Sequence, residues 1–307
     1  MLAYKRQTKL MGNIFELTVV SNDEAWANER IDSAIKEIQR IEAVFTTFRD
    51  NSETNLINRN AGIEPVPVSD EVFSLIERSI RISKLTQGAF DITYGSIDKK
   101  LWNFDQHMTS LPDPAIAKQM VQLINYRNII LDPEKKTVFL KLKGMRIGFG
   151  GIGKGYAAEM AKKLMQTEGV ESGIVNASGD LCAWGYQPDG KPWTVGIIHP
   201  DFNHLPFSYM NISGLAVATS GNYEKFVIIN GRKYSHTINP KTGLPVRGIK
   251  SVTIISPNAE LSDALATPVT IMGVNAGLYL INQLKGVECV IIDDNNRIYT
   301  SNNIHLS

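Results

Sequence analysis

Residues 148–166 read GFGGIGKGYAAEMAKKLMQ, a glycine-rich run that passes directly into a segment with helical spacing from about Tyr156 to Gln166. Free N–H groups and the positive dipole end at a helix N-terminus favour a bound phosphate, and Lys154 adds a positive charge there. The glycine spacing fits neither the dinucleotide-binding fingerprint nor the Walker A loop. Two interpretations stay open: a phosphate-binding loop, or a tight strand-to-helix turn that needs several glycines.

The chain before this run predicts a strand followed by two amphipathic helices. Residues Ile14 to Val20 alternate as in a half-buried strand. Asn22 or Asp23 can cap a long helix whose isoleucines fall on one face, and Ser69 can cap a second helix. A strand followed by a helix is expected to place that helix on a sheet.

The segments nearer the C-terminus predict more strands with helices between them. The elements expected there are a helix over 114–124, strands near 128–131 and 138–142, strand-like runs over most of 174–255, and helices around 261–272 and 276–284 before two closing strands. This order is neither a regular βαβ alternation nor a repeat array. We therefore expect an α+β fold, with an antiparallel or mixed sheet, helices packed on it, and residues 1–307 in a single unit.

Composition and charge exclude several classes of protein. The chain has 307 residues, 43% hydrophobic and 21% charged, which is typical of a globular protein with a substantial core. Its formal net charge is +1, so it has no global basic field to hold a nucleic acid. Cys182 and Cys289 lie far apart without a CxxC motif, and we expect both to be buried small hydrophobes rather than a disulfide or a zinc site.

The first residues carry no targeting signal that can be identified. Residues 1–20, MLAYKRQTKLMGNIFELTVV, have basic charges but no uninterrupted apolar run, small-residue cleavage site or lipidated cysteine. No stretch approaches the ~20 apolar residues of a membrane span. We therefore expect no stable membrane insertion and, for the chain as written, a cytoplasmic location; a chain that had lost a leader would look the same.

Asp263 and Thr267 are candidate metal ligands. They lie four residues apart on the expected helix 261–272, so their side-chain oxygens share a face. A carboxylate and a hydroxyl, joined by backbone carbonyls, waters and substrate phosphates, suit Mg²⁺, which prefers oxygen ligands in octahedral geometry. In a competing structural interpretation, Asp263 serves the helix start near Ser262 and Thr267 takes part in packing. Without further support, that interpretation is preferred.

Two polar segments carry further candidates. Residues 234–243, YSHTINPKTG, end in a turn, and His236 within them is either a general acid or a hydrogen-bonded structural residue. Residues 176–180, NASGD, join two apolar strands, where Asp180 can be a simple turn residue. Composition alone identifies both segments as loops.

Seven segments, taken in chain order, resemble the ApbE family, the FAD:protein FMN transferases once described as thiamine-biosynthesis lipoproteins. They are FTTFRDNSETNLINRN at 45–60, GAFDITYGSI at 88–97, GGIGKGYA at 150–157, VNASGD at 175–180, AVATSGNYEKF at 216–226, YSHTINPKTGLPV at 234–246 and DALAT at 263–267. Each segment alone is weak support, but their order across most of the chain is not expected by chance. The resemblance implies an α+β fold related to the T-fold.

The resemblance also implies a magnesium site that joins the glycine run to the DALAT segment. Its ligands fall on the side chains of Asp263 and Thr267 and on the main-chain carbonyl of Gly151. The implied contacts to FAD are Met11, Phe48, Ala89, Phe90, Asp91, Lys154 and Thr237. His236, Lys154 and Asp180 are implied as the polar residues that support catalysis.

Four positions depart from the family pattern. Gly148 stands where the family commonly has an acidic residue, so one polar contact to the nucleotide is missing. Phe48 replaces a frequent tyrosine, keeping the stacking face but losing the hydroxyl. Ile92 replaces a proline and Asn222 a frequent aspartate. These changes bear on FAD affinity, nucleotide preference or activity, and they leave the implied metal ligands in place.

The activity implied by the resemblance is Mg²⁺-dependent transfer of the FMN moiety of FAD to a Thr or Ser hydroxyl of an acceptor flavoprotein, a redox subunit, with release of AMP. The nucleophile belongs to the acceptor, which fits a sequence without a convincing Ser/His/Asp or Cys/His constellation. Two alternatives stay open: an FAD pyrophosphatase that yields FMN and AMP, and a flavin-binding protein without turnover. Members of the family are often periplasmic or membrane-anchored.

Overall fold

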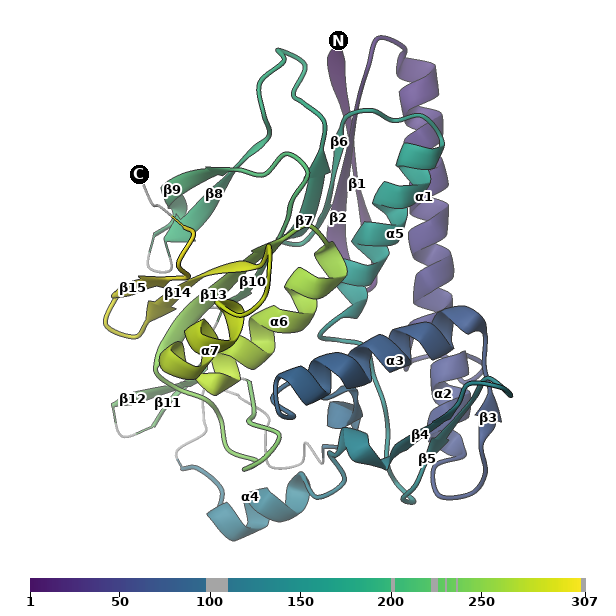
Figure 1. Cartoon of the computed structure of the whole chain (residues 1–307), viewed down its shortest axis with the longest axis vertical. Helices are drawn as coiled ribbons and strands as arrows, with labels where there is room; N and C mark the ends of the chain where they lie inside the picture. The colour runs from purple at the N-terminus through teal and green to yellow at the C-terminus, as the bar shows by residue number, and fades with distance from the viewer. Residues whose placement is uncertain (98–109, 200–201, 222–225, 230, 236, 305–307) are drawn as a thin grey trace.

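An antiparallel sheet of eight strands forms the centre of the part of the chain that the structure describes, residues 1–97, 110–199, 202–221, 226–229, 231–235 and 237–304. In this computed structural model the strands are β1 (Leu2–Leu10), β2 (Asn13–Ser21), β6 (Gly173–Ala177), β7 (Asp180–Trp184), β10 (Ala216–Gly221), β13 (Ile249–Ser256), β14 (Glu288–Asp293) and β15 (Ile298–Thr300). They lie side by side in this same order, and each neighbouring pair is antiparallel (Figure 1).

A layer of helices covers one face of this sheet. It consists of α1 (Glu24–Phe45), α5 (Gly153–Thr167), α6 (Ala259–Met272) and α7 (Val274–Ile281). α1 packs on β1 and β2, α5 on β6 and β7, α6 on β10 and β13, and α7 on β14, while each helix also contacts the next (Figure 1). Fully buried isoleucines of α1 lie in the same core cluster as Phe15 and Leu17 of β2. The main core therefore lies between the helices and the sheet.

A hairpin packs near the middle of the main sheet and has a small core of its own. It is formed by β8 (Thr194–His199) and β9 (Phe202–Asn211). The buried residues of this second core are Val20, Leu181, Ala183, Trp193, Ile212, Val217 and Ile255. Leu181 and Val217 come from β7 and β10, so the centre of the sheet is apolar on the face that this cluster covers as well.

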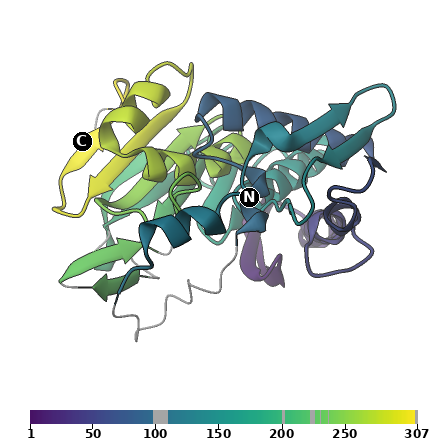
Figure 2. The same cartoon turned by 90° about the horizontal axis from the view of Figure 1, so that it is seen from below.

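The remaining elements lie beside and below the sheet. They are α2 (Glu53–Arg59), β3 (Val66–Pro67), α3 (Asp70–Leu85), η1 (Ile92–Ser96), α4 (Pro114–Met120), η3 (Tyr126–Asn128), β4 (Ile129–Asp132), β5 (Thr137–Leu140), β11 (Phe226–Ile229) and β12 (Arg232–Ser235). β3, β5 and β4 form a small sheet of their own. Seen from below, the blue segments around α3 lie on one side and the green and yellow C-terminal segments on the other (Figure 2).

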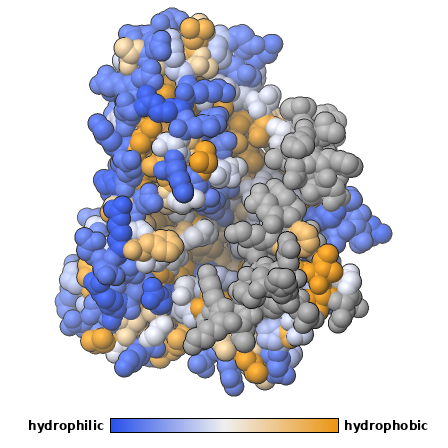
Figure 3. Space-filling view, turned by 180° about the vertical axis from the view of Figure 1, so that it is seen from behind, coloured by the Kyte–Doolittle hydropathy of each residue, from blue (hydrophilic) through white to orange (hydrophobic). Residues whose placement is uncertain are grey.

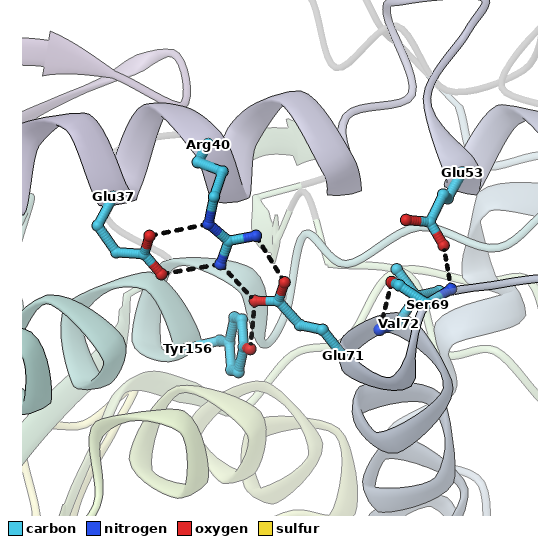
Figure 4. A network of polar contacts seen from close by, with 7 residues as sticks. All are labelled: Glu37, Arg40, Glu53, Ser69, Glu71, Val72 and Tyr156. Carbon is cyan, nitrogen blue, oxygen red and sulfur yellow. Dashed lines mark hydrogen bonds and ion pairs between the residues drawn. The ribbon is translucent and has the colours of Figure 1, made fainter.

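A network of charged side chains ties three helices together where they meet (Figure 4). Arg40 of α1 donates to both oxygens of Glu71 of α3, at 2.7 and 2.8 Å, and also to Glu37. The Tyr156 hydroxyl of α5 donates to Glu71 at 2.6 Å. These hydrogen bonds lower the pKa of Glu71 below its usual 4.5, because they favour the charged carboxylate, although partial burial opposes them. The network holds the beginning of α5 against α1 and α3.

The α+β class and its antiparallel sheet agree with the prediction, and the differences are local. Asp23 and Ser69 cap α1 and α3, accepting from the N–H groups of Trp26 and Val72. β1 and α2 were not predicted, and α2 falls within the segment 45–60, for which the sequence analysis predicted no helix or strand. Both cysteines are buried and unpaired, as predicted. Across the described residues, no helix combines the length and apolar character needed to cross a membrane.

Candidate functional site

The glycine run places α5 in close contact with α6. α5 begins at Gly153, inside the run, and has no side-chain cap of its own residues. Instead, the Asp263 carboxylate of α6 accepts a hydrogen bond from the Gly155 N–H at 2.8 Å. A Cβ at Gly155 would lie 2.2 Å from the Ala259 carbonyl oxygen and 2.6 Å from the Asp263 Cβ. Gly155 therefore serves helix packing, and part of the positive end of α5 is occupied by Asp263.

A cluster of three charged groups lies at this contact, of which Asp180 and Asp263 are buried and Lys154 is partly buried. The Lys154 ammonium forms an ion pair with Asp180, and its Nζ lies 4.0 Å from Asp263 Oδ1. The pKa of Asp263 is raised to about 6, because burial and, to a smaller extent, the nearby Asp180 outweigh the opposing effects of Lys154 and the α5 amide groups. Burial acts to lower the pKa of Lys154, but the two carboxylates outweigh it and the net shift is upward. Two acids share one cation here, which suits the addition of another positive charge.

Thr267 and Gly151 are the other two residues predicted to bind a metal, and both line the two cavities described below. Thr267 follows Asp263 by one helical turn in α6, as predicted, and its hydroxyl has no hydrogen-bond partner among the described residues. No group of three or more His, Cys, Asp or Glu side chains able to hold a metal occurs in that part of the chain. The donors here are one carboxylate, one free hydroxyl and a main-chain carbonyl, a set of hard oxygen atoms that fits Mg²⁺ and leaves positions for substrate oxygens.

A first cavity, of about 580 Å³, lies on one side of this cluster. Its lining includes Phe48, Ala89, Phe90, Asp91 and Thr237, five of the residues predicted to contact FAD. Phe48 is 96% exposed, whereas Phe90 is buried. Seen from behind, the molecule is hollowed near its centre, and the hollow is coloured as hydrophobic (Figure 3). An apolar cavity with one exposed aromatic ring at its rim is suited to a flat aromatic ligand.

Asp91 lines this cavity but its carboxylate is committed to the backbone. Its oxygens accept from the N–H and hydroxyl of Thr93 and from the N–H of Tyr126, each within 2.8 Å. Burial raises the pKa of Asp91, and these hydrogen bonds only partly counter the rise. Asp91 therefore shapes the cavity wall by holding η1 and η3 together.

A second cavity, of about 720 Å³, contains the charged cluster. Lys154, Asp180 and Asp263 line it, together with the turn between β6 and β7 and the end of β10. The two cavities share Gly150, Gly151, Ser220 and Thr267. Two of the three predicted metal ligands thus lie where the cavities meet, and the third lines the second cavity beside them.

Some of the predicted residues line neither cavity, and others lie outside the described residues. Met11 lies in the β1–β2 turn with a φ of 51° and lines neither cavity, although a Cβ at Gly153 would lie 3.5 Å from its Cε. His236 and Asn222 lie outside the described residues. Gly148 lines the first cavity and donates its N–H to the Ile92 carbonyl. A Cβ there would meet only Thr47, at 3.7 Å, so the acidic residue of the family pattern is not excluded by space.

Several residues of the cavity walls were not predicted from the sequence. Thr47, Arg146, Pro268 and Ile271 line the first cavity. Thr47 lies inside one of the segments that carried the family resemblance, and Pro268 directly follows another. The resemblance could therefore have identified both residues. Arg146 and Ile271 belong to no recognisable motif, and only the fold brings them to the cavity.

Comparison with known proteins gives the same family along nearly the whole chain. The family model described as "ApbE family" matches residues 11–291. The chain is 31% identical over 301 residues to the FAD:protein FMN transferase of Klebsiella pneumoniae (strain 342), covering 97% of this chain and 92% of that protein. It is 28% identical to the FAD:protein FMN transferase of Treponema pallidum (strain Nichols), covering 97% and 86%.

Solved structures agree with this result. The crystal structure of the ApbE protein from Thermotoga maritima superposes with a TM-score of 0.86 at 29% identity, covering 98% of this chain and 97% of that one. The apo flavinyl transferase ApbE of Pseudomonas stutzeri has the same fold, with a TM-score of 0.85 at 23% identity and coverage of 98% and 95%. Because the family model spans most of the sequence and these relatives match nearly all of it, the chain belongs to the ApbE family.

Proposed function

We propose that this protein transfers the FMN moiety of FAD to a Thr or Ser hydroxyl of an acceptor flavoprotein and releases AMP. The observation that carries the proposal is the place where the two cavities meet. There Gly151 and Thr267 lie beside the Lys154, Asp180 and Asp263 cluster. The relatives named FAD:protein FMN transferase support the same activity.

In this proposal FAD occupies the first cavity, with the flavin ring near Phe48 and the pyrophosphate at the junction. Asp263, Thr267 and the Gly151 carbonyl would hold Mg²⁺, which when bound supplies a counter-charge for the pyrophosphate. Lys154 places a second positive charge in the adjoining cavity and is held there by Asp180. Ala89 and Phe90 form part of the apolar wall, and Thr237 adds a polar group to the same cavity.

In the transfer, one bond forms and one bond breaks at the FMN phosphorus. The acceptor hydroxyl oxygen bonds to that phosphorus, the bridging P–O bond breaks, and AMP leaves with the electron pair of that bond. The hydroxyl proton passes to a base or to water, and His236 and Asp180 are the candidate bases. The enzyme forms no covalent intermediate of its own, since the nucleophile belongs to the acceptor.

Mass spectrometry of an acceptor peptide tests the activity. The protein is incubated with FAD, Mg²⁺ and a peptide bearing the family's acceptor motif, and the peptide should gain the mass of FMN while AMP appears. Free FMN and AMP with an unmodified peptide would make the protein an FAD pyrophosphatase instead. FAD binding without AMP release would make it a flavin-binding protein that has lost turnover.

A matched pair of threonine variants tests the metal ligands. Thr267→Val should lower Mg²⁺-dependent AMP formation by at least tenfold, and Asp263→Ala should abolish it. Thr270→Val is the control, because Thr270 lies on the same helix, lines neither cavity and donates to the Ala266 carbonyl at 3.0 Å. Full AMP formation by a folded Asp263→Ala variant would rule out the proposed metal site.

A further inference from the structure

The main sheet has a gap on one side of β10. β7 pairs with β10 at only two positions, Ala216 with Cys182 and Val217 with Leu181. On its other side β10 stays paired with β13 as far as Gly221, which lies opposite Ser251. Over residues 218–221, β10 therefore has a neighbouring strand on one side only, within the described part of the chain.

The alternation of the strand shows which backbone groups face this gap. The Leu215 carbonyl accepts from the Ala183 N–H at 3.0 Å, so the polar backbone groups of residue 215 face β7. Because the pattern repeats every second residue, those of Thr219 and Gly221 face the same side. The register would place Gly179 opposite Thr219, but the Gly179 N–H is instead donated to the Asn176 side chain. Thr219 and Gly221 thus present an open strand edge.

The second cavity fills this gap and reaches both faces of the sheet. Asp263, Ala266 and Thr267 line it from α6. Val195 and Gly196 of the β8–β9 hairpin line it as well, and that hairpin packs with the separate core cluster that contains Val217. The cavity is thus a slot through the sheet, bounded by the end of β10 on one side and by the β6–β7 turn on the other.

The slot suits an extended peptide. Neighbouring strands in a sheet lie about 4.8 Å apart, and the end of β10 extends past the short Ser178–Gly179 turn, so no strand of the described residues takes the neighbouring position beyond that turn. A strand added to a free edge gains main-chain hydrogen bonds that do not depend on its sequence, while its alternate side chains point to the two faces. One of those faces holds Lys154, Asp180 and Asp263.

We propose that the acceptor protein binds by adding a β-strand to the open edge of β10 at Thr219 and Gly221. The strand occupies the slot, and its Thr or Ser side chain points toward Lys154 and Asp263. This inference rests on the proposed flavin transfer and states how the same site takes its protein substrate. A backbone-directed docking mode lets one enzyme modify acceptors of different sequence, provided that the hydroxyl is at the right register.

Backbone methylation of the acceptor peptide tests this inference. A set of peptides carries one N-methyl group at each successive position around the modified residue, and flavinylation of each is compared with the parent peptide. Methylation at alternate positions should reduce kcat/KM by at least tenfold, because those N–H groups face β10, while the intervening positions should change it by less than threefold.

One variant of the enzyme tests the other side of the same contact. Gly221→Pro removes an N–H from the open edge and should raise the KM for the peptide by about tenfold. FAD affinity is measured in this variant to detect general damage. A parent peptide that is never flavinylated counts against the proposed function itself. If the parent peptide is flavinylated but methylation has the same small effect on kcat/KM at every position, the strand-addition inference alone is wrong. Competition between the peptide and FAD for the slot would also contradict it.

Discussion

Gly155→Ala should separate the helices that carry the site. The new methyl would lie 2.2 Å from a backbone carbonyl of α6, so the conflict cannot be relieved by a side-chain rotation. Overpacking of this kind costs about 1–3 kcal/mol, and loss of the Gly155 hydrogen bond to the Asp263 carboxylate costs about 1.5–3 kcal/mol. The better helix propensity of alanine returns about 1 kcal/mol. We expect a net loss of about 1.5–5 kcal/mol.

Thermal unfolding and AMP release together test this value. An unfolding entropy of about 2.1 cal/mol/K per residue over 307 residues converts the loss into a fall of about 2–8 °C in Tm. AMP formation should fall as well, because Asp263 and Thr267 move together with α6 away from the glycine run. Gly153→Ala is the control, since a Cβ there meets Met11 and Phe149 at 3.5 Å, an ordinary contact. If Gly155→Ala matches Gly153→Ala in both Tm and activity, the close approach of α5 and α6 is not needed.

Three further changes separate ligand contacts from stability. Phe48→Ala should leave Tm unchanged, because the ring is 96% exposed, and should weaken FAD binding about 3- to 10-fold in a fluorescence titration. Met11→Asn should raise the free energy of unfolding by up to about 1 kcal/mol in urea, since asparagine tolerates a φ of 51°, and should lower FAD affinity. Glu71 has a lowered pKa, so its ion pair with Arg40 stabilises the fold above pH 4.5 and is lost as the pH falls through the folded value. Glu71→Gln should therefore be less stable than the parent at pH 7, with a difference that shrinks in unfolding measurements toward pH 3.

Local sequence signals predicted most of the helices, and the missed elements lacked such signals. Asp23 and Ser69 are side-chain caps that act within their own helix, so they can be recognised without the fold. β1 is an outer strand of the sheet with exposed charged side chains, which hides the alternation that a buried face produces. α2 is short and polar, and its stability comes from packing rather than from an apolar stripe.

The candidate site needed more than local signals, because its contacts join distant segments. Asp263 was expected either to bind a metal or to serve the start of its own helix, yet Asn258 caps α6 and the Asp263 carboxylate instead accepts from α5. Nothing in the DALAT segment identifies Gly155 as that partner. The open edge of β10 is equally invisible in sequence, since it depends on where β7 begins relative to β10.

The glycine run is better understood one residue at a time than as a single motif. A Cβ at Gly150 would meet nothing within 4 Å, and Gly150 borders both cavities, so its missing side chain leaves room for a ligand. Gly155 lies against α6 with no space to spare, so its missing side chain leaves room for a helix. The packing interpretation is confirmed at Gly155, whereas the phosphate-binding interpretation stays a prediction that the open space at Gly150 allows. Because the close approach at Gly155 also positions Asp263, substitution of this packing glycine is expected to disturb the proposed ligand site as well.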